Sequence, residues 1–288
     1  MSQRFRPITR RKTAASLVCG TNRQWSPLRA SHVLHGLLVI ACALLIVEAS
    51  AGDLRPGIFG KDDRRVIDQQ SPPWSAIGQV NVAGYRRTKR CTGSLIAKNL
   101  VITAAHCVMD ASTRKPFPPH RIHFLAGVKG SGWLGHSTAK CLHFPPGYEY
   151  VGPSKLLPNL PFQDVPRRAL SRDTALIVLK DRLNNVAPLQ VERTQPQSSK
   201  ISLVHASYPS DRRYVLSGHF GCKILAQDEN LWFTDCDTHA ASSGGPVFIR
   251  DKDGLKLAAI MVGAAARSYS IAVPVASWVD LPAKRICP

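Results

Sequence analysis

Residues 91–107 read CTGSLIAKNLVITAAHC, and this stretch says most about the fold. It holds two short apolar runs, Ser94–Ile96 and Leu100–Thr103, with a polar Lys-Asn pair between them, as in two strands joined by a tight turn. The second run leads through Ala-Ala into His106. Cysteines stand at both ends, 16 residues apart, and a disulfide between them would hold His106 at the end of a strand.

The rest of the chain repeats this character, with short apolar runs separated by Gly, Pro, Asn and Asp and no long helical periodicity. The runs lie at residues 76–82, 94–96, 100–103, 121–125, 175–179, 201–205, 214–217, 246–249, 257–262 and 270–273. Many short strands bounded by turn residues predict an all-β sandwich or barrel. One helix is expected near the C-terminus, in SWVDLPAKR (277–285), and the Pro-rich segment 143–168 is expected to be a surface loop.

The first 51 residues differ from the rest. Positions 1–29 hold seven Lys or Arg and no acidic residue, an apolar run of about a dozen residues spans Gly36–Val47, and residues 49–51 read ASA. A basic region, a short apolar run and small residues at the cleavage position make a secretory signal peptide, so we expect cleavage after Ala51. The alternative is an uncleaved signal anchor, although the run is shorter than the roughly 20 residues that span a membrane.

Composition and charge are those of a globular, basic protein. The chain has 288 residues, of which 44% are apolar. Without the leader, 31 basic and 18 acidic residues remain, a net charge of about +13. A basic surface attracts polyanions. No arginine-rich block or nucleic-acid motif concentrates the charge, and this argues against nucleic-acid binding.

Cysteine use agrees with export. Six cysteines follow the leader: Cys91, Cys107, Cys141, Cys222, Cys236 and Cys287. An even number in an exported domain indicates disulfides, although the residues alone do not choose among the pairings. None of them forms a C-x-x-C pair with partners at zinc-site spacing, so no metal or other cofactor is expected.

Two further stretches offer groups that could act with His106. Asp173 precedes the apolar run at 175–179, where a poorly solvated carboxylate needs a donor such as a histidine N–H. Ser243 precedes Gly244-Gly245-Pro246 and another apolar run, which is typical of a tight turn. Each feature alone has an ordinary structural explanation. Together, in the order His, Asp, Ser, they indicate nucleophilic hydrolysis.

These motifs resemble those of the trypsin/chymotrypsin-like serine proteases. The resemblance rests on CTGSLIAKNLVITAAHC (91–107), DTALIVL (173–179) and SSGGPVF (242–248), and it extends from about Trp74 to the terminal helix. FGKDDRRVI (59–67), PPWSAIGQV (72–80) and DCDTHAASSGGP (235–246) look more like the bacterial glutamyl-endopeptidase-like branch. The resemblance implies an all-β fold of two packed six-stranded antiparallel β-barrels with a C-terminal helix.

The resemblance also implies the roles of the site residues. Ser243 is the expected nucleophile, His106 its general base, and Asp173 the residue that orients the imidazole. The backbone N–H groups of Ala241 and Ser243 are the expected oxyanion hole. The family usually has glycine at the position of Ala241, and alanine there must adopt a left-handed conformation that costs roughly 1–2 kcal/mol.

Two more departures concern activation and specificity. Ser242 stands where digestive enzymes carry the aspartate that pairs with a newly cut amino terminus, so we expect no such ion pair here. Asp237 lies six residues before Ser243, where trypsin-like enzymes bind Arg or Lys, and it is our candidate specificity residue. The expected peptide-binding strand edge is Met261, Val262, Gly263, Ala264 and Ala265. Substrate preference stays open, with a basic one slightly favoured.

Three disulfides are expected. The family motif and the short loop favour Cys91–Cys107. Cys222 and Cys236 flank a hairpin with its turn at AQDEN (226–230), and Cys141–Cys287 follows by elimination. Each should contribute about 3 kcal/mol in the chain-entropy description.

The sequence therefore predicts a secreted or periplasmic serine endopeptidase that acts on polypeptides as a monomer. We expect four segments: the signal peptide 1–51, an N-terminal segment 52–65 that another protease could remove, a first barrel 66–185, and a second barrel with the helix, 186–288. Membrane attachment is expected only if the leader stays uncleaved. One alternative is an inactive protein of this fold that binds anionic envelope polymers or a protein partner. Another is an esterase, which the lack of a G-x-S-x-G motif opposes.

Overall fold

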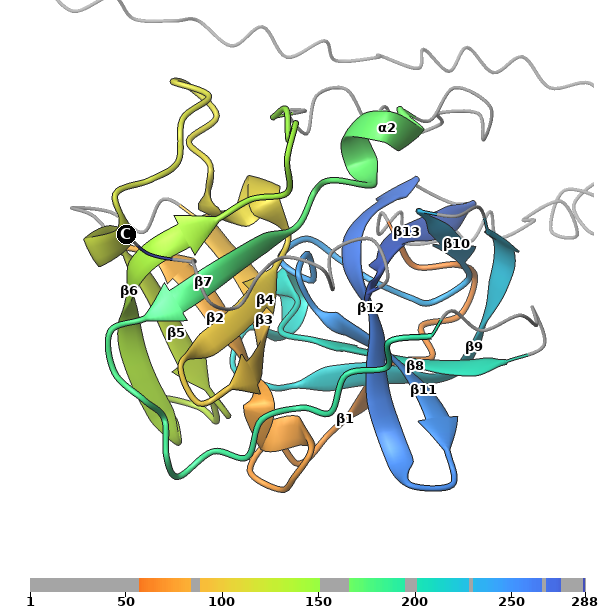
Figure 1. Cartoon of the computed structure of the whole chain (residues 1–288). Helices are drawn as coiled ribbons and strands as arrows, with labels where there is room; N and C mark the ends of the chain where they lie inside the picture. Colours follow the sequence, from red (N-terminus) through yellow and green to blue (C-terminus); the bar gives the residue numbers. More distant parts are fainter. Residues whose placement is uncertain are drawn as a thin grey trace, which may run out of the picture. The chain divides into compact units, whose positions relative to one another are not determined.

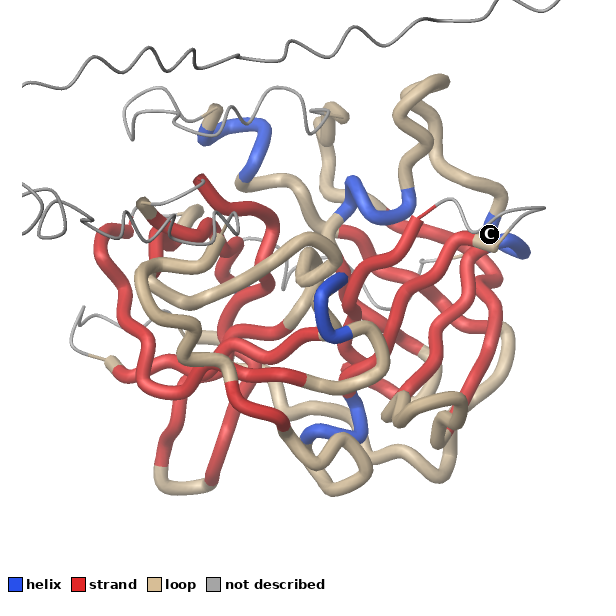
Figure 2. The backbone as a smooth tube through the Cα atoms, turned by 180° about the vertical axis from the view of Figure 1, so that it is seen from behind, coloured by secondary structure: helices blue, strands red, loops and turns tan. Residues whose placement is uncertain are grey.

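The computed structural model describes residues 57–83, 89–150, 166–194, 201–227, 230–265, 268–275 and 287. The predicted signal peptide, the predicted C-terminal helix, the AQDEN turn at 228–229 and the middle of the Pro-rich segment lie outside these residues. The described residues belong to one compact unit, Asp53–Pro288, in which strands joined by loops greatly outnumber helices (Figures 1 and 2).

The first barrel is closed by six antiparallel strands in the order β2-β3-β4-β7-β6-β5. In a half-buried strand, successive side chains point alternately toward the barrel interior and toward its outer surface. In β5, for example, Phe124 is fully buried while its neighbours His123 and Leu125 are only partly buried. The strands are β2 (Ile77–Val82), β3 (Lys89–Ala97), β4 (Leu100–Thr103), β5 (Ile122–Ala126), β6 (Gly135–His143) and β7 (Ala175–Leu179).

The second barrel follows the first along the chain and lies beside it, in cyan to blue in Figure 1. Pairing of β8 with both β11 and β9 closes it, and the short strand β1 (Arg65–Val66) adds to β9. A segment before the first barrel thus joins the second one. The strands are β8 (Ser202–Ser207), β9 (Ser217–Gln227), β10 (Trp232–Thr234), β11 (Pro246–Asp251), β12 (Gly254–Ala265) and β13 (Tyr269–Pro274).

Helix is confined to single turns in the described residues. None of these helices is long and apolar enough to cross a membrane. They are the α-helix α2 (Arg167–Leu170) and the 3₁₀ turns η1 (Trp74–Ala76), η2 (Ala105–Val108), η3 (Pro119–Arg121) and η6 (Ser210–Arg212).

The predicted fold class of two six-stranded antiparallel barrels is confirmed. Most predicted runs are strands within one to a few residues. The run 214–217 is wrong, because residues 214–216 precede β9 and the strand begins at Ser217. The sequence also did not predict β6, most of β9, or β10.

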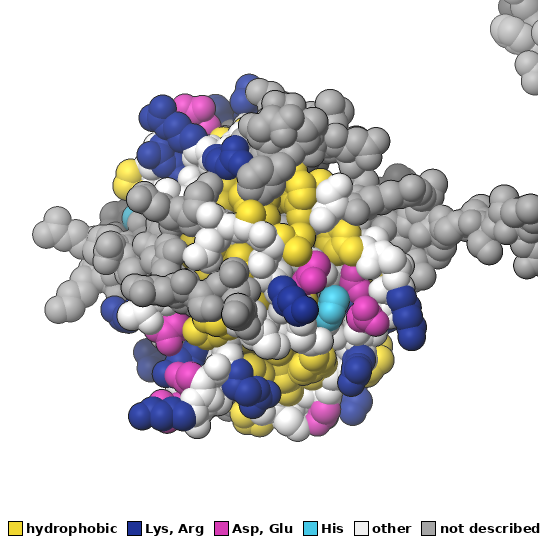
Figure 3. All heavy atoms as spheres, turned by 90° about the vertical axis from the view of Figure 1, so that its right-hand side faces the viewer, with side chains coloured by type: hydrophobic (Ala, Val, Ile, Leu, Met, Phe, Trp, Pro, Cys, Tyr) yellow, Lys and Arg dark blue, Asp and Glu magenta, His cyan; other side chains and the backbone are white. Residues whose placement is uncertain are grey.

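All three expected disulfides are present: Cys91–Cys107, Cys141–Cys287 and Cys222–Cys236. Cys141–Cys287 ties the end of the chain to β6 of the first barrel. On the face drawn in Figure 3, Lys and Arg side chains are scattered among acidic and apolar ones rather than gathered in one block.

Candidate active site

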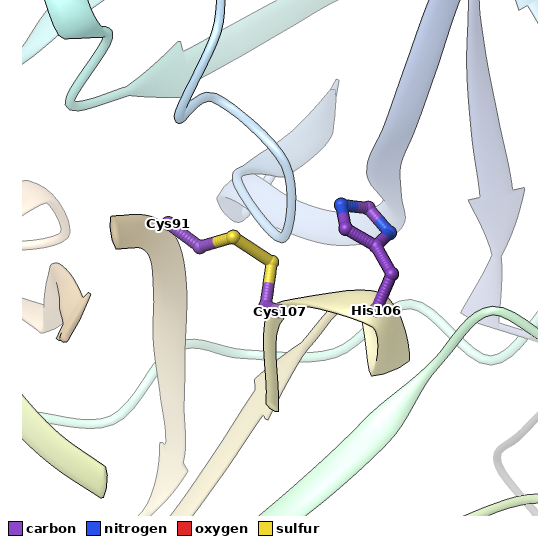
Figure 4. Close-up of side chains that lie close together, drawn as sticks. All are labelled: Cys91, His106 and Cys107. Atoms are coloured by element: carbon purple, nitrogen blue, oxygen red, sulfur yellow. A yellow bond between two sulfur atoms is a disulfide. The ribbon is translucent and has the colours of Figure 1, made fainter. Parts of the chain in front are cut away.

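His106 lies on η2, directly after β4 (Figure 4). The disulfide from Cys107 to Cys91 fastens this turn to β3, with 5.9 Å between the two Cα atoms. The imidazole projects from η2 beside the disulfide. The 91–107 motif therefore folds as expected, into two strands and a turn that is held by a covalent bond next to the histidine.

Asp173 lies against His106 because β4 pairs with β7, which begins two residues after the aspartate. The Asp173 Oδ2 is 2.6 Å from the His106 Nδ1, and Oδ1 accepts the backbone N–H of His106 at 2.8 Å. The carboxyl is buried. A carboxylate can only accept, so Nδ1 carries the proton and Nε2 presents a lone pair.

Two tyrosines and a lysine surround this pair. Burial, and then the charge of Asp173, raise the pKa of both Tyr148 and Tyr150. Lys89 donates through Nζ to the carbonyl oxygens of His106 and Met109, and burial lowers the pKa of this amine. Lys89 thus fastens η2 and the residue after it through their backbone carbonyl groups. This role was not predicted, because a lysine two residues before a cysteine in a strand carries no distinguishing pattern.

Ser243 is brought to the same place by β3. The Thr92 N–H donates to the Ser243 carbonyl at 2.9 Å, and the Thr92 hydroxyl donates to the Ala241 carbonyl at 3.1 Å. The Cys107 Sγ lies 3.7 Å from the Ser243 carbonyl oxygen. The backbone of the serine therefore rests against the disulfide that adjoins His106. Thr92 was also missed by the sequence analysis.

The loop around Ser243 leaves two donors unused. Ala241 has φ 72°, the left-handed conformation that its place in the motif requires. The neighbouring N–H groups are bonded: Ser242 donates to His239, and Gly245 donates to Ser242. Within the described part of the chain, the N–H groups of Ala241 and Ser243 donate to no acceptor. Both residues are partly exposed, so these donors are open to a ligand.

Gly244 is where the two barrels approach most closely beside the serine. Its φ is +79°, and a Cβ there would lie 2.1 Å from the Thr103 Oγ1 and 2.2 Å from the Thr92 carbonyl oxygen. Only glycine fits such an approach.

Ser242 takes the place of the family's activating aspartate. Its hydroxyl is buried and accepts from the Ser207 hydroxyl at 2.9 Å and from the His239 N–H at 3.2 Å. The position is thus filled by neutral groups in a closed hydrogen-bond cluster.

The carboxylate of Asp237 is already hydrogen-bonded to other parts of the chain. It is 1% exposed. Its Oδ1 accepts the N–H of Phe59 and its Oδ2 accepts the N–H of Asp63, both at 2.9 Å. The candidate specificity carboxylate therefore faces the N-terminal segment, and neither oxygen is left for the cation of a substrate.

The predicted peptide-binding edge divides into two parts. Both backbone groups of Met261 are used by the serine loop, since its carbonyl accepts from Gly244 and its N–H donates to Gly245. Of the next residues, Gly263–Ala265 pair with β13 on one side, and Val262 lies at the register shift between Met261 and Gly263. β11 reaches only Ile260, so their other side has no strand partner among the described strands.

Two groups in the described residues have the composition of a metal site. The first is Cys91, Cys107 and His106, but both sulfurs are in the disulfide. The second is Asp63, His219 and Asp237, whose ligand atoms lie within 4.8 Å of one another. There the His219 Nδ1 accepts the Asp237 N–H at 2.8 Å, so its lone pair is already used. Neither group fits a resident metal.

A pocket of about 380 Å³ lies away from these residues, on the outer face of the first barrel. Its polar walls include His123 and His136, whose facing ring nitrogens are 2.9 Å apart. This spacing fits a single shared proton. None of the predicted site residues lines this pocket.

The sequence of the chain is similar to those of known proteins. Phenoloxidase-activating factor 3 of Holotrichia diomphalia is 28% identical over 257 residues, covering 77% of this chain and 70% of that protein. A trypsin-like protease of Streptomyces glaucescens is 28% identical over 174 residues, covering 57% of this chain and 60% of the relative's own length.

Two solved structures share the fold. A Glu endopeptidase in complex with MPD superposes with a TM-score of 0.60 at 19% identity, covering 75% of this chain and 93% of that chain. The protease Anisep from Arthrobacter nicotinovorans superposes with a TM-score of 0.53 at 20% identity, covering 73% and 92%. Residues 91–256 match the trypsin-like peptidase domain as a family. This span covers more than half of the chain and contains His106, Asp173 and Ser243, and the chain belongs to the trypsin-like peptidase family.

Proposed function

We propose that the protein is an exported serine endopeptidase that cleaves peptide bonds through an acyl-enzyme, with His106, Asp173 and Ser243 as its triad. The observation that carries the proposal is the two-point contact between Asp173 and His106. It fixes both the orientation of the ring and the tautomer in which Nε2 can accept a proton.

The chemistry follows from these groups. As the Ser243 hydroxyl attacks the carbonyl carbon, its proton passes to the His106 Nε2, and the imidazolium is stabilised by the buried Asp173. The proton then goes to the leaving amine, which departs and leaves the acyl-enzyme. Water attacks the ester with His106 again as base, and this releases the acid and restores the serine.

The free N–H groups of Ala241 and Ser243 support an oxyanion hole in this loop. Such donors stabilise the negative charge that develops on the carbonyl oxygen, and losing one typically costs about 3 kcal/mol of transition-state stabilisation. The substrate backbone would extend β12 along the open side of Val262–Ala265, by the strand-addition mode. Met261 is not available for this role, because the loop already uses its backbone.

The same loop bears on the inactive alternative. That reading depended on the alanine at position 241 and on the basic charge. Ala241 adopts the left-handed conformation, so the alanine is no obstacle to the turn, and the catalytic reading is favoured. Three disulfides agree with export, since such bonds persist in oxidising compartments.

Labelling with a fluorophosphonate probe tests the proposal. We expect modification at Ser243 alone, and Ser243→Ala should abolish both labelling and cleavage of labelled casein. Ser112→Ala, at an exposed turn, is the matched control and should label like the parent. A folded parent protein that neither labels nor cleaves would support the inactive binding protein instead.

A further inference from the structure

The segment from Gly57 to Ile67, here called the N-terminal strap, crosses to the second barrel and fastens to the loop before Ser243. At one end, the Thr238 N–H donates to the Gly57 carbonyl at 2.8 Å. At the other, β1 pairs with β9 and the Ile67 N–H donates to Leu216 at 2.9 Å. The strap is thus bonded to the second barrel at both of its ends.

Asp237 is the centre of this attachment. Its two oxygens accept the strap's Phe59 and Asp63 N–H groups, and its own N–H donates to the His219 Nδ1. The same ring nitrogen lies 3.4 Å from the Asp237 Oδ2. Among the described residues, the hydrogen bonds to this buried carboxylate all come from the strap. Removing them would leave an uncompensated buried charge, which costs several kcal/mol.

A second attachment runs through Arg64. Its buried guanidinium binds Asp62 within the strap and Asp211 on η6, with Nη2–Oδ2 distances of 2.9 and 2.6 Å. The η6 residue Ser210 in turn donates its N–H to the Ala240 carbonyl at 2.7 Å and lies 2.9 Å from the His239 ring. The strap therefore reaches residues 237–240 by two independent routes.

Residues 237–240 lead directly into the proposed oxyanion hole. The Ser242 hydroxyl accepts the His239 N–H, and Ser242 also donates its N–H to His239. The direction of the Ala241 N–H consequently depends on how residues 237–240 are held. Thr92 and Met261 fasten the loop from its far side.

We infer that the intact strap, bound through its peptide N–H groups, holds the oxyanion-hole loop in its working shape, and that Asp237 is a positioning residue rather than a specificity residue. This inference rests on the proposed function. It also means that a cut within the strap inactivates the protein, so removal of residues 52–65 is not an activating step.

Asp237→Asn is the first test, because the amide keeps the shape but replaces one acceptor with a donor facing an N–H. We expect the rate constant of fluorophosphonate labelling to fall by about tenfold to a hundredfold, with casein kcat reduced more than KM. Asp253→Asn, an exposed carboxylate in the β11–β12 turn, is the control. The inference is wrong if Asp237→Asn labels normally and instead loses a preference for Lys or Arg in a peptide library.

Two glycines of the strap give a second, milder test. Gly57 and Gly60 both have positive φ, +87° and +82°, so alanine strains either backbone similarly. A Cβ at Gly57 would lie 2.7 Å from the Thr238 carbonyl oxygen, whereas one at Gly60 meets nothing within 4 Å. Gly57→Ala should slow labelling several-fold and Gly60→Ala should not. Equal effects would mean that backbone strain, not contact with the loop, is responsible.

The third test compares one folded protein before and after cutting, so both measurements start from the same folded chain. A site for a sequence-specific protease is inserted after Gly60, at an exposed part of the strap, and labelling is compared before and after cutting. We expect a loss on cutting. A gain would show activation by a new amino terminus and overturn the inference. A parent protein that never labels would refute the proposed function itself, which is a distinguishable result.

Discussion

The two halves of the proposed active site are built in different ways. The first-barrel half, His106 and Asp173, is held by a disulfide between residues 16 apart and by pairing of β4 with β7. The second-barrel half, residues 237–245, depends on the strap, which is 174 and 178 residues away at the two Asp237 bonds, and on Thr92, 149 residues from Ala241. The first half is thus held within its own barrel, by residues up to 67 positions apart, and the second half by segments from outside its barrel.

The largest expected effect comes from breaking the first half. Asp173→Asn should lower kcat by about 10⁴-fold while the protein stays folded, because the amide donates to Nδ1 and forces the proton onto Nε2. Steady-state cleavage of casein and circular dichroism measure the two outcomes. If the variant retained more than a tenth of the parent activity, Asp173 would not set the tautomer.

A smaller effect concerns the stability of the second half, which should depend on pH. His205 of β8 is buried beneath the second half, where its Nδ1–H donates to the Pro246 carbonyl at 3.1 Å. Burial lowers the pKa of this imidazole to about 4. Between pH 6.5 and 4, the unfolded chain therefore binds a proton at this histidine that the folded chain does not bind. The free energy of unfolding is thus at its full value above pH 6.5 and falls by about 3 kcal/mol as the pH falls toward 4.

His205→Asn keeps a donor near the Nδ1 position and cannot titrate. Urea unfolding at pH 7 and pH 4.5 should show a smaller loss of unfolding free energy for this variant than for the parent. The same loss in both would mean that other groups cause the acid sensitivity.

The smallest effect sharpens the description of the second half. Ala241→Gly should relieve a left-handed alanine, worth roughly 1–2 kcal/mol, against a glycine entropy cost of about 0.5–1 kcal/mol. We expect a net gain of roughly 0–1.5 kcal/mol in the free energy of unfolding by urea, with labelling unchanged or slightly faster. A clear destabilisation would mean that the alanine methyl group packs favourably.

Local pattern predicted the first half and little of the second. The apolar run at 175–179 and the motif at 91–107 fold as expected. Their apolar residues indicate strands, and the cysteines at the two ends of the motif indicate which segments lie together. β6 was missed because its fully buried residues, such as Ser137 and Ala139, are small and are separated by polar residues, so no apolar run marks the strand. β9 was missed because it begins Ser-Gly and contains Gly221.

The hydrogen-bond partners of Asp237 were not predicted, for a similar reason. Counting residues back from Ser243 located the carboxylate correctly along the chain, but its hydrogen-bond donors lie before the first barrel. No local pattern at 235–246 could show that those donors exist. The clue in the sequence is that no lysine or arginine stands near Asp237, so its hydrogen-bond donors must come from elsewhere.

Gly244 determines how closely the second barrel can approach the first beside Ser243. A side chain there would collide with the Thr103 hydroxyl and the Thr92 carbonyl of the first barrel. Any larger residue at position 244 would therefore push the serine loop away from the barrel that carries the histidine. The absence of a side chain at this one position thus lets the two barrels meet beside Ser243.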